Sequence, residues 1–351
     1  MRILVTGGCG FIGSALVLHL VLDLGHDVLT LDALTYAANP ASLKPLDGHS
    51  RHRLVHGDIC NPELAAELFA NFRPEAVIHL AAESHVDRSI TGPAAFIWTN
   101  VLGTQVMLEA ARAYYMAELT GPEKENFRLL HVSTDEVYGS LPLGDGFFTE
   151  QSCYNPRSPY SASKAASDHL ARAWHHTYGL PVVVTNCSNN YGPRQFPEKL
   201  IPLQILNAIS GKALAVYGDG LNERDWIHVE DHARALVATL EKGRPGETYL
   251  LGGRSVRSNI SVVQTICAIL DRLRPDGGPH ARLIGFVADR PGHDRRYAID
   301  PGKAETELGW HPSRSFEDGL EDTVRWYVEN PDWWRPIREG RYAGERLGLT
   351  A

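Results

Sequence analysis

The 351-residue chain lacks paired cysteines and long hydrophobic runs. Its five cysteines are scattered, odd in number and without CxxC or metal-ligand spacing, which excludes a disulfide framework and favours reduced thiols. No apolar run is long enough to cross a bilayer, and no basic segment precedes an apolar stretch near Met1. These absences predict a cytoplasmic protein without a signal peptide or membrane segment.

An excess of positive charge and clustered histidines are also missing. The formal net charge is −8, so neither nucleic acid nor an anionic membrane is expected as a partner. The sixteen histidines are dispersed, and His175-His176 and His49/His52 have no cysteine or carboxylate at ligand spacing. We therefore expect no metal site. The 43% hydrophobic content with mixed charges is typical of a globular protein.

The first half of the chain alternates short apolar strands with helical patterns. Val- and Leu-rich runs without strict polar alternation suit parallel strands that are buried on both faces. The predicted strands are Ile3–Thr6, Val28–Asp32, Arg53–Asp58, Ala76–Ala82, Arg128–Thr134 and Val182–Cys187. The predicted helices are Phe11–Leu24, Pro62–Asn71, Asn100–Glu118 and Tyr160–Tyr178, and the polar stretch 121–126 is predicted as a surface loop. This order predicts an α/β fold with a Rossmann-type doubly wound parallel sheet.

The pattern is less regular after Asn189, where prolines and glycines interrupt it. Asp231–Leu240 and Ile260–Leu273 still look helical. We predict a first domain over residues 1–189, to which segments around 225–253 return. Residues 190–351 should mainly form a smaller mixed α/β lobe over the carboxyl edge of the sheet.

A glycine-rich turn follows the first predicted strand. Gly7, Gly10 and Gly13 form a GxxGxxG variant of the dinucleotide fingerprint, in which missing side chains let backbone N–H groups approach a pyrophosphate. Alone, such a turn could be an ordinary strand–helix connection. Here Asp32 ends the next strand, where an acid can accept hydrogen bonds from the adenosine ribose and repel a 2′-phosphate. The combination predicts an NAD site in the first domain.

Two further strand ends fit this site less specifically. Asp58 ends the third strand and could reach the adenine edge, but a capping role before Pro62 is nearly as plausible. Leu80-Ala81-Ala82 supplies small side chains at the end of the fourth strand. They suit close approach of a cofactor, although packing against a helix would also explain them.

The reacting groups are predicted from two neighbouring segments. Thr134, Asp135 and Glu136 follow an apolar strand and should lie at its carboxyl end, where ligands bind in open α/β sheets. Tyr160 and Lys164 are four residues apart in a predicted helix and share one face. A neighbouring ammonium can lower the pKa of a tyrosine from its usual value of about 10. The set offers a base for a hydroxyl proton together with a second acid and a second base.

The chain resembles the extended short-chain dehydrogenase/reductase superfamily in its GxxGxxG turn and its YxxxK pair. Five further segments resemble the dTDP-glucose 4,6-dehydratase family, and the likeness runs from Arg2 to about Trp310. The Asp-Glu pair distinguishes these dehydratases from the 4-epimerases. The segments are Ala82–Ser89, Ser133–Gly139, Thr185–Pro193, Arg224–His232 and Asp289–Tyr297.

The resemblance implies an NAD-dependent lyase that makes the 4-keto-6-deoxy sugar used for rhamnose and related deoxysugars. Tyr160, assisted by Lys164, would remove the C4 hydroxyl proton while hydride passes to NAD+, and Thr134 would hydrogen-bond the C4 oxygen. Glu136 would take the C5 proton, Asp135 would protonate the departing C6 hydroxyl, and hydride would return to C6. Physically, two adjacent carboxyls cannot both ionise easily, so one remains an acid beside a base.

The resemblance also implies the binding residues. The NAD contacts are Gly7, Gly10, Phe11, Ile12, Gly13, Asp32, Thr35, Asp58, Ile59, Leu80, Ala81, Ala82, Ser84, Thr99, Tyr160, Lys164 and Asn190. The substrate contacts are Ser84, Thr134, Asn189, Lys199, Leu200, Tyr217, Arg224, Asn259, Arg290 and His293. Lys199 and Arg224 suit a diphosphate. Ala215 stands where the family usually has proline before the tyrosine, which weakens the expectation of a dTDP nucleotide.

Three alternatives remain open at this point. A UDP-sugar 4-epimerase would need Tyr160 and NAD but no acid pair, so Asp135 and Glu136 argue against it. A UDP- or GDP-sugar 4,6-dehydratase is closer, and a non-catalytic NAD-binding scaffold belongs to a different class. The resemblance further implies a homodimer, for which Asn100–Glu118 and Tyr160–Tyr178 could supply the interface.

Overall fold

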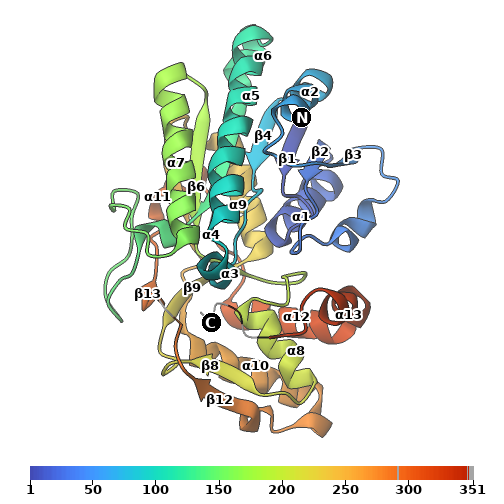
Figure 1. Ribbon diagram of the computed structural model, residues 1–351, viewed down its shortest axis with the longest axis vertical. Coiled ribbons are helices and arrows are strands. Elements are labelled where there is room, and N and C mark those ends of the chain that lie inside the picture. The colour runs from blue at the N-terminus through green and yellow to red at the C-terminus, as the bar shows by residue number, and fades with distance from the viewer. Residues whose placement is uncertain (291, 346, 348–351) are drawn as a thin grey trace.

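A seven-stranded parallel sheet forms the larger half of the molecule, as the computed structural model shows (Figure 1). The structure describes residues 1–290, 292–345 and 347. Pro291 of the Asp289–Tyr297 segment and residues 346 and 348–351 of the predicted lobe lie outside the described residues. The strand order is β10-β6-β5-β4-β1-β2-β3, so the chain reverses its direction of winding between β1 and β4. The predicted doubly wound Rossmann-type sheet is confirmed.

The apolar runs of the first half form the buried strands of this sheet. β5 and β6 have the predicted bounds, β1 and β2 each begin one residue earlier, and β3 and β4 end before Asp58 and Ala82. The seventh strand, β10, comes from a late part of the chain and pairs with β6, Thr248 opposite Val184. The strands are β1 (Arg2–Thr6), β2 (Asp27–Asp32), β3 (His52–His56), β4 (Ala76–His79), β5 (Arg128–Thr134), β6 (Val182–Cys187) and β10 (Thr248–Leu251).

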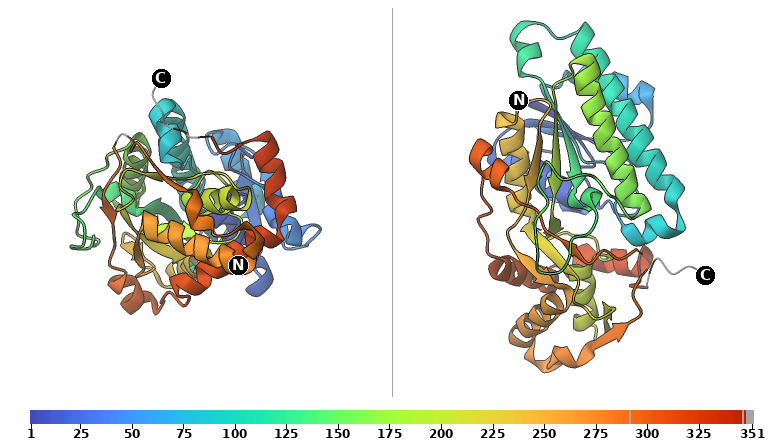
Figure 2. Two further views of the ribbon diagram at one scale, coloured as in Figure 1. Left: turned by 90° about the horizontal axis from the view of Figure 1, so that it is seen from below. Right: turned by 90° about the vertical axis from the view of Figure 1, so that its left-hand side faces the viewer.

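Helices cover both faces of the sheet (Figure 2). One face packs against α2 (Pro62–Phe72), α5 (Thr104–Ala117) and α7 (Pro159–Tyr178), through a core that includes Leu68, Met107 and Ala171. The other face packs against α1 (Phe11–Leu18), α9 (Val229–Lys242) and α11 (Gly302–Leu308), through a core that includes Leu16 and Leu236. The sheet is therefore buried on both faces, as its near-continuous apolar strands require.

Two predicted helices differ in detail from the observed ones. The predicted helix Phe11–Leu24 is observed as α1 followed by a π-helical segment, His19–Asp23. The predicted helix Asn100–Glu118 is observed as α5, preceded by a π-helical segment, Ile97–Gly103, that begins before the predicted start. The predicted surface loop 121–126 was wrong, because these residues form the short helix α6 (Gly121–Asn126). Pro122 presets a helical φ in the first turn and Glu and Lys favour helix, which outweighs the polar composition.

A smaller lobe lies below the carboxyl edge of the sheet in Figure 1. Two short sheets, β11-β9-β13 with β7 beside β9 and β12-β8, pack with helices around a separate core that includes Ile205, Ile266 and Leu320. None of the described helices is long and apolar enough to span a membrane. The elements are β7 (Asn189–Tyr191), α8 (Leu200–Ile209), β8 (Leu214–Tyr217), β9 (Glu223–His228), β11 (Val256–Ser258), α10 (Asn259–Leu273), β12 (Ile284–Val287), β13 (Arg296–Tyr297), α12 (Phe316–Glu329) and α13 (Pro331–Gly340).

Contacts over long sequence distances join the lobe to the larger half. The indole N–H of Trp333 in α13 donates to the Ser42 hydroxyl at 3.1 Å, and Arg341 donates to the Ala38 carbonyl at 2.7 Å. Two short helices, α3 (Val86–Thr91) and α4 (Pro93–Phe96), lie between the sheet and the lobe in Figure 1. These contacts fix the lobe over the carboxyl ends of the strands.

Candidate active site

A cavity of about 310 Å³ opens at the carboxyl ends of the central strands. It lies where the strand order reverses, which is the position at which open α/β sheets bind ligands. Most of the predicted site residues share its wall. Those that line it are Gly7, Gly10, Phe11, Ile12, Gly13, Asp32, Thr35, Asp58, Ile59, Leu80, Ala81, Ala82, Ser84, Thr99, Thr134, Glu136, Tyr160, Lys164, Asn189, Asn190 and Lys199.

The glycine turn forms one side of this cavity. Gly7 has φ +75°, and a Cβ there would lie 2.8 Å from the backbone nitrogen of Ala81, so only glycine fits. A Cβ on Gly13 would lie 2.1 Å from the Gly7 carbonyl oxygen. Gly10 is the N-cap of α1 and provides no capping side chain. The first N–H groups of α1 thus remain available to an anion, which fits the pyrophosphate of a dinucleotide.

The carboxylate of Asp32 is held beside this turn by backbone hydrogen bonds. The Cys9 and Leu34 N–H groups each donate to one of its oxygens at 2.8 Å. Asp58 also lines the cavity and accepts from the Cys60 N–H at 2.9 Å. The alternative capping role considered for Asp58 belongs to Asn61, whose side chain accepts from the Leu64 N–H at 3.0 Å.

Tyr160 and Lys164 are placed by the first turns of α7. Ser158 caps this helix in a capping box with Ser161, and Pro159 occupies its first turn. Both side chains are buried, and the Lys164 ammonium donates to the Val132 carbonyl at 2.9 Å. We expected the ammonium to lower the tyrosine pKa. In the protein chain itself, burial and then the Glu136 charge raise the pKa of Tyr160 well above its usual value, and only a hydrogen bond with Thr134 opposes them.

The acid pair lies directly after β5. Thr134 caps the short 3-10 helix Asp135–Tyr138, with its hydroxyl accepting from the Glu136 N–H at 3.2 Å. Burial, then the charges of Glu136 and Asp225, raise the pKa of Asp135 well above its usual range. Burial also raises the pKa of Glu136, but the charges of Arg290, Lys199 and Arg224 oppose this shift. Asp135 is therefore the better proton donor and Glu136 the better base.

Asp135 does not line the cavity, although Thr134 and Glu136 do. Its side chain is almost wholly buried, and its Oδ2 atom has no hydrogen-bond partner among the described residues. The raised pKa favours the protonated form of Asp135, and a protonated carboxyl has a hydrogen to donate.

Three predicted cations of the lobe carry positive charge toward Glu136. Lys199 lines the cavity, and its ammonium donates to the Ser84 carbonyl at 2.8 Å. Arg224 donates to the Asp294 carbonyl at 2.8 Å and stacks over the Tyr297 ring at 4.2 Å. Arg290 pairs with Asp87 at 2.6 Å. Arg224 and Arg290 are thus held by local partners outside the cavity wall, while their charges act on Glu136.

Four other predicted substrate contacts lie in the lobe, outside the cavity wall. Leu200 packs against the lobe core, and the Tyr217 ring lies 6.3 Å from the His293 ring. His293 pairs with Asp289 at 2.6 Å, and burial lowers its pKa to about 4. Asn259, at the start of α10, has a buried Oδ1 atom without a partner in the described part of the chain.

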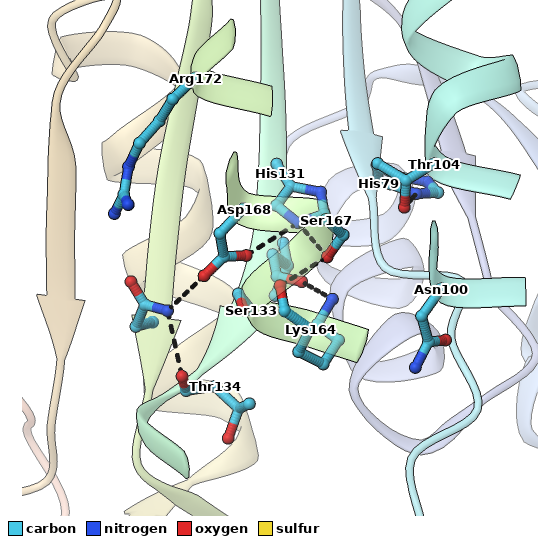
Figure 3. A network of polar contacts seen from close by, with 12 residues as sticks. His79, Asn100, Thr104, His131, Ser133, Thr134, Lys164, Ser167, Asp168 and Arg172 are labelled. Carbon is cyan, nitrogen blue, oxygen red and sulfur yellow. Dashed lines mark hydrogen bonds and ion pairs between the residues drawn. The ribbon is translucent and has the colours of Figure 1, made fainter. Parts of the chain in front are cut away.

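Sequence reasoning missed several buried charged groups around the site. Glu83 and Glu198 line the cavity, and Glu198 accepts from Arg88 at 2.8 Å and from the Tyr36 hydroxyl at 3.0 Å. Behind Lys164, Asp168 is fully buried in a polar network with His131 (Figure 3). The only sequence signal for Asp168 is its place four residues after Lys164 on one helix face.

The described residues contain no cluster of histidine, cysteine and carboxylate side chains that could hold a metal ion. The arrangement instead combines a dinucleotide cradle, a buried tyrosine and lysine, an acid and a base side by side, and cations from the lobe. Such a site can remove a hydroxyl proton, abstract a carbon-bound proton and protonate a leaving group on one ligand.

Comparison with known proteins gives consistent relatives. The profile of the family described as GDP-mannose 4,6 dehydratase matches residues 4–323. A dTDP-glucose 4,6-dehydratase of Escherichia coli is 57% identical, with 100% of this chain and 100% of that protein covered. A probable dTDP-glucose 4,6-dehydratase of Sinorhizobium fredii is 60% identical, with 99% of each chain covered.

Solved structures give the same likeness. The crystal structure of DesIV, a dTDP-glucose 4,6-dehydratase from Streptomyces venezuelae with NAD and TYD bound, has a TM-score of 0.87 at 49% identity over 96% of this chain and 100% of that chain. A UDP-glucose 4-epimerase from Thermotoga maritima with UDP-glucose has a TM-score of 0.83 at 28% identity over 94% of this chain and 100% of that chain.

Proposed function

The chain belongs to the nucleotide-sugar 4,6-dehydratases, within the dTDP-glucose 4,6-dehydratase family, and we propose that it converts dTDP-glucose to dTDP-4-keto-6-deoxyglucose and water. The observation that carries the reaction is that Glu136 and Tyr160 line one cavity, with Asp135 directly before Glu136 in the chain. An epimerase needs only the tyrosine and the cofactor. The enzyme is an NAD-dependent lyase, and its product is a precursor of deoxysugars.

We propose that residues 1–189, with segments around 225–253, hold NAD, and that residues 190–351 mainly bind the nucleotide sugar. The glycine turn and the uncapped N-terminus of α1 fit the pyrophosphate, and the Asp32 carboxylate fits the ribose hydroxyls. Asn190 lines the same cavity, and its amide oxygen pairs with His232 at 2.9 Å. When bound, NAD+ would supply the hydride acceptor for C4, and its reduced form would supply the hydride donor for C6.

At C4, Tyr160 takes the hydroxyl proton as hydride leaves that carbon. The Thr134 hydroxyl hydrogen-bonds the same oxygen, and the Lys164 ammonium stabilises the tyrosinate. Burial of Tyr160, and then the Glu136 charge, make its anion costly in the protein chain alone, so a neighbouring cation would favour the tyrosinate. Lys164 lies four residues after Tyr160 in α7 and so shares its helix face.

At C5 and C6, the two carboxyls act in turn. Glu136 accepts the C5 proton, which the adjacent keto group makes acidic. Asp135 gives its proton to the C6 hydroxyl, which leaves as water. The charges of Arg290, Lys199 and Arg224 oppose the rise that burial causes in the pKa of Glu136, whereas burial and then the charges of Glu136 and Asp225 raise the pKa of Asp135 well above its usual range. After the second hydride transfer, Glu136 returns a proton to C5.

The deciding experiment is incubation of the purified protein with dTDP-glucose, followed by mass spectrometry and proton NMR. Loss of one water, a new C6 methyl signal and no net NADH are expected. UDP- and GDP-sugars are run in parallel. Dehydration of one of these instead of dTDP-glucose would assign a different nucleotide and direct attention to the pocket around Ala215. No turnover of any sugar by NAD-loaded protein would leave the scaffold alternative.

We further propose that the protein is a homodimer through the face formed by α5, α7 and the segment Ile97–Gly103. Large apolar side chains on these elements are exposed: Ile97 (52%), Trp98 (59%), Met116 (55%) and Tyr178 (44%). α5 and α7 lie side by side on one face of the molecule (Figure 2). A second copy on this face would bury these side chains.

Light scattering tests this interface. Two chains per particle are expected, and Trp98→Asp should give one chain per particle. Phe286→Asp, at an exposed residue of β12, is the matched control that should leave the dimer intact. Wild-type protein with one chain per particle would contradict the proposal. We also propose a cytoplasmic location, where nucleotide sugars and NAD are found, which cell fractionation would test.

A further inference from the structure

We propose that Asp168 is a positioning residue of the reacting centre: its buried carboxylate lies one helical turn after Lys164 and is joined through Asn186 to the Thr134 end of β5. The inference rests on the proposed function, because Lys164 and Thr134 matter only if this cavity catalyses the reaction. Asp168 itself lines no part of the cavity wall. It would act through other residues and never touch the substrate.

The carboxylate of Asp168 lies one helical turn after Lys164. The two residues are four apart in α7 and share the face that packs on the sheet. The Asp168 side chain has no exposed surface. In Figure 3 it lies beside His131 of β5, with Lys164 on one side and Arg172 on the other.

Three donors hold this carboxylate, and all three are neutral groups. His131 Nε2 lies 3.1 Å from Oδ1, and the Tyr154 hydroxyl and the Asn186 amide donate to Oδ2 at 2.8 and 3.0 Å. Burial lowers the pKa of His131, so this ring donates its Nε2 hydrogen as a neutral imidazole. Within the described residues, no lysine or arginine forms an ion pair with Asp168.

A buried negative charge without a contacting cation is costly, so its hydrogen bonds must compensate. Burial raises the pKa of Asp168, but the His131 hydrogen bond and the Lys164 charge outweigh it and bring the pKa below its usual value, so the group stays ionised. A neutral amide would not replace it, because its NH2 group would face a donor from His131 or Asn186. The network thus selects an anion at this position.

The charge of Asp168 acts on Lys164. Burial lowers the pKa of Lys164, and the Asp168 charge is the largest influence that opposes this shift. Other titratable and charged groups surround the pair. They are His79 of β4, His131 of β5, Cys187 of β6, Tyr160 and Arg172 of α7, Tyr138 of the short 3-10 helix, and Tyr154 before α7. Among them Asp168 is the group that stays negative, so it keeps the ammonium protonated.

A second arm of the network reaches the acid pair. The same Asn186 amide that donates to Asp168 also donates to the Thr134 carbonyl at 3.0 Å. Thr134 in turn caps the segment that carries Asp135 and Glu136. One carboxylate therefore supports both the lysine of the base pair and the strand end that presents the two acids.

The test is the pH dependence of kcat for dTDP-glucose dehydration in Asp168→Asn. Without the negative charge, Lys164 loses its proton at lower pH, so the alkaline limb should move to lower pH by roughly one unit. Tyr154→Phe removes one hydrogen bond to the carboxylate but keeps its charge, so it should leave the limb in place. In a Lys164→Arg background, Asp168→Asn should no longer move the limb, because arginine stays charged.

An active, folded Asp168→Asn enzyme with the wild-type alkaline limb would overturn the proposal. An alkaline limb that shifts as much in Tyr154→Phe as in Asp168→Asn would also overturn it, because the shift would then follow from changed packing and not from the lost charge. If Asp168→Asn does not fold, Asp168→Glu keeps the charge and displaces the oxygens. This variant should have a lower kcat but the wild-type alkaline limb, and a shifted alkaline limb would contradict the proposal. Wild-type protein without turnover refutes the proposed function itself, which is a separate result.

Discussion

The two halves of the molecule contribute different kinds of group to one cavity. The sheet half places its groups through short local segments: the glycine turn after β1, the acid pair after β5, and Tyr160 and Lys164 at the start of α7. The lobe acts mainly through charge, with Lys199 at the wall and Arg224 and Arg290 outside it. Reacting groups must be held at fixed positions relative to the substrate. The binding of a diphosphate and the pKa of a carboxylate, in contrast, respond to charges over longer distances. The contrast predicts large rate effects in the sheet half and affinity or pH effects in the lobe.

The strongest test of the contrast is Glu136→Gln in the sheet half. The amide cannot accept the C5 proton, so product formation should fall by about 10²- to 10⁴-fold while NAD still binds. Sugar product is followed by NMR, and NAD affinity by fluorescence. Glu118→Gln, at an exposed carboxylate paired with Arg73, is the control and should keep the wild-type rate. An undiminished rate in Glu136→Gln would remove this residue from the mechanism.

A lobe cation should give a different signature. Lys199→Met removes a positive charge from the cavity wall, so KM for the nucleotide sugar should rise roughly ten- to hundredfold with a smaller change in kcat. Lys212→Met, at an exposed lysine after α8, should change neither constant. Steady-state kinetics at saturating NAD separates the two constants. A fall in kcat alone would mean that the lobe also serves the chemistry, and the contrast would fail.

The lobe should also set the pH range over which the sheet half works. The Arg290 charge opposes the effect of burial on Glu136, so Arg290→Met should raise the pKa of Glu136. Because Glu136 must be ionised to act as a base, the acidic limb of kcat should move to higher pH, by roughly one unit. Arg295→Met, at a surface arginine paired with Asp219, is the control. An acidic limb that stays in place would show that Arg290 does not act on Glu136.

The smallest expected effects come from two helix caps, one in each half. Ser158 caps α7, and Ser315 caps α12 by accepting from the Asp318 N–H at 3.1 Å. Either serine changed to alanine should lower the free energy of unfolding by about 1 kcal/mol, which urea denaturation measures. Only Ser158→Ala should also lower kcat, because α7 carries Tyr160 and Lys164. Equal kcat in both variants would mean that the cap of α7 does not position the base.

Local sequence patterns predicted the sheet half well, because its features are contiguous. β5 and β6 have the predicted bounds, and the predicted helix Tyr160–Tyr178 is α7 with one residue added. The patterns were less accurate where an adjacent residue determines which residue caps a helix or whether a short segment is helical. Asn61, and not Asp58, caps α2, and Pro122 starts a helix in a polar stretch.

Contacts between distant segments were beyond the sequence. Asp168 meets His131, Tyr154 and Asn186 from three other parts of the chain, and no spacing reveals that they converge. The pairing of Arg290 with Asp87 and the stacking of Arg224 on Tyr297 are equally non-local. The family resemblance identified Arg224 and Arg290 as site residues, but only the structure shows which partners position their guanidinium groups.

The late origin of β10 has a consequence for how the protein is made. Between the end of β6 at Cys187 and the start of β10 at Thr248, the chain builds β7, α8, β8, β9 and α9. α9 then covers the sheet beside α1, so a nascent chain that stops before these elements leaves that face and the β6 edge open. Such a chain exposes apolar surface and an unpaired strand edge on the ribosome. Synthesis must therefore pass through much of the lobe before the nucleotide half can close.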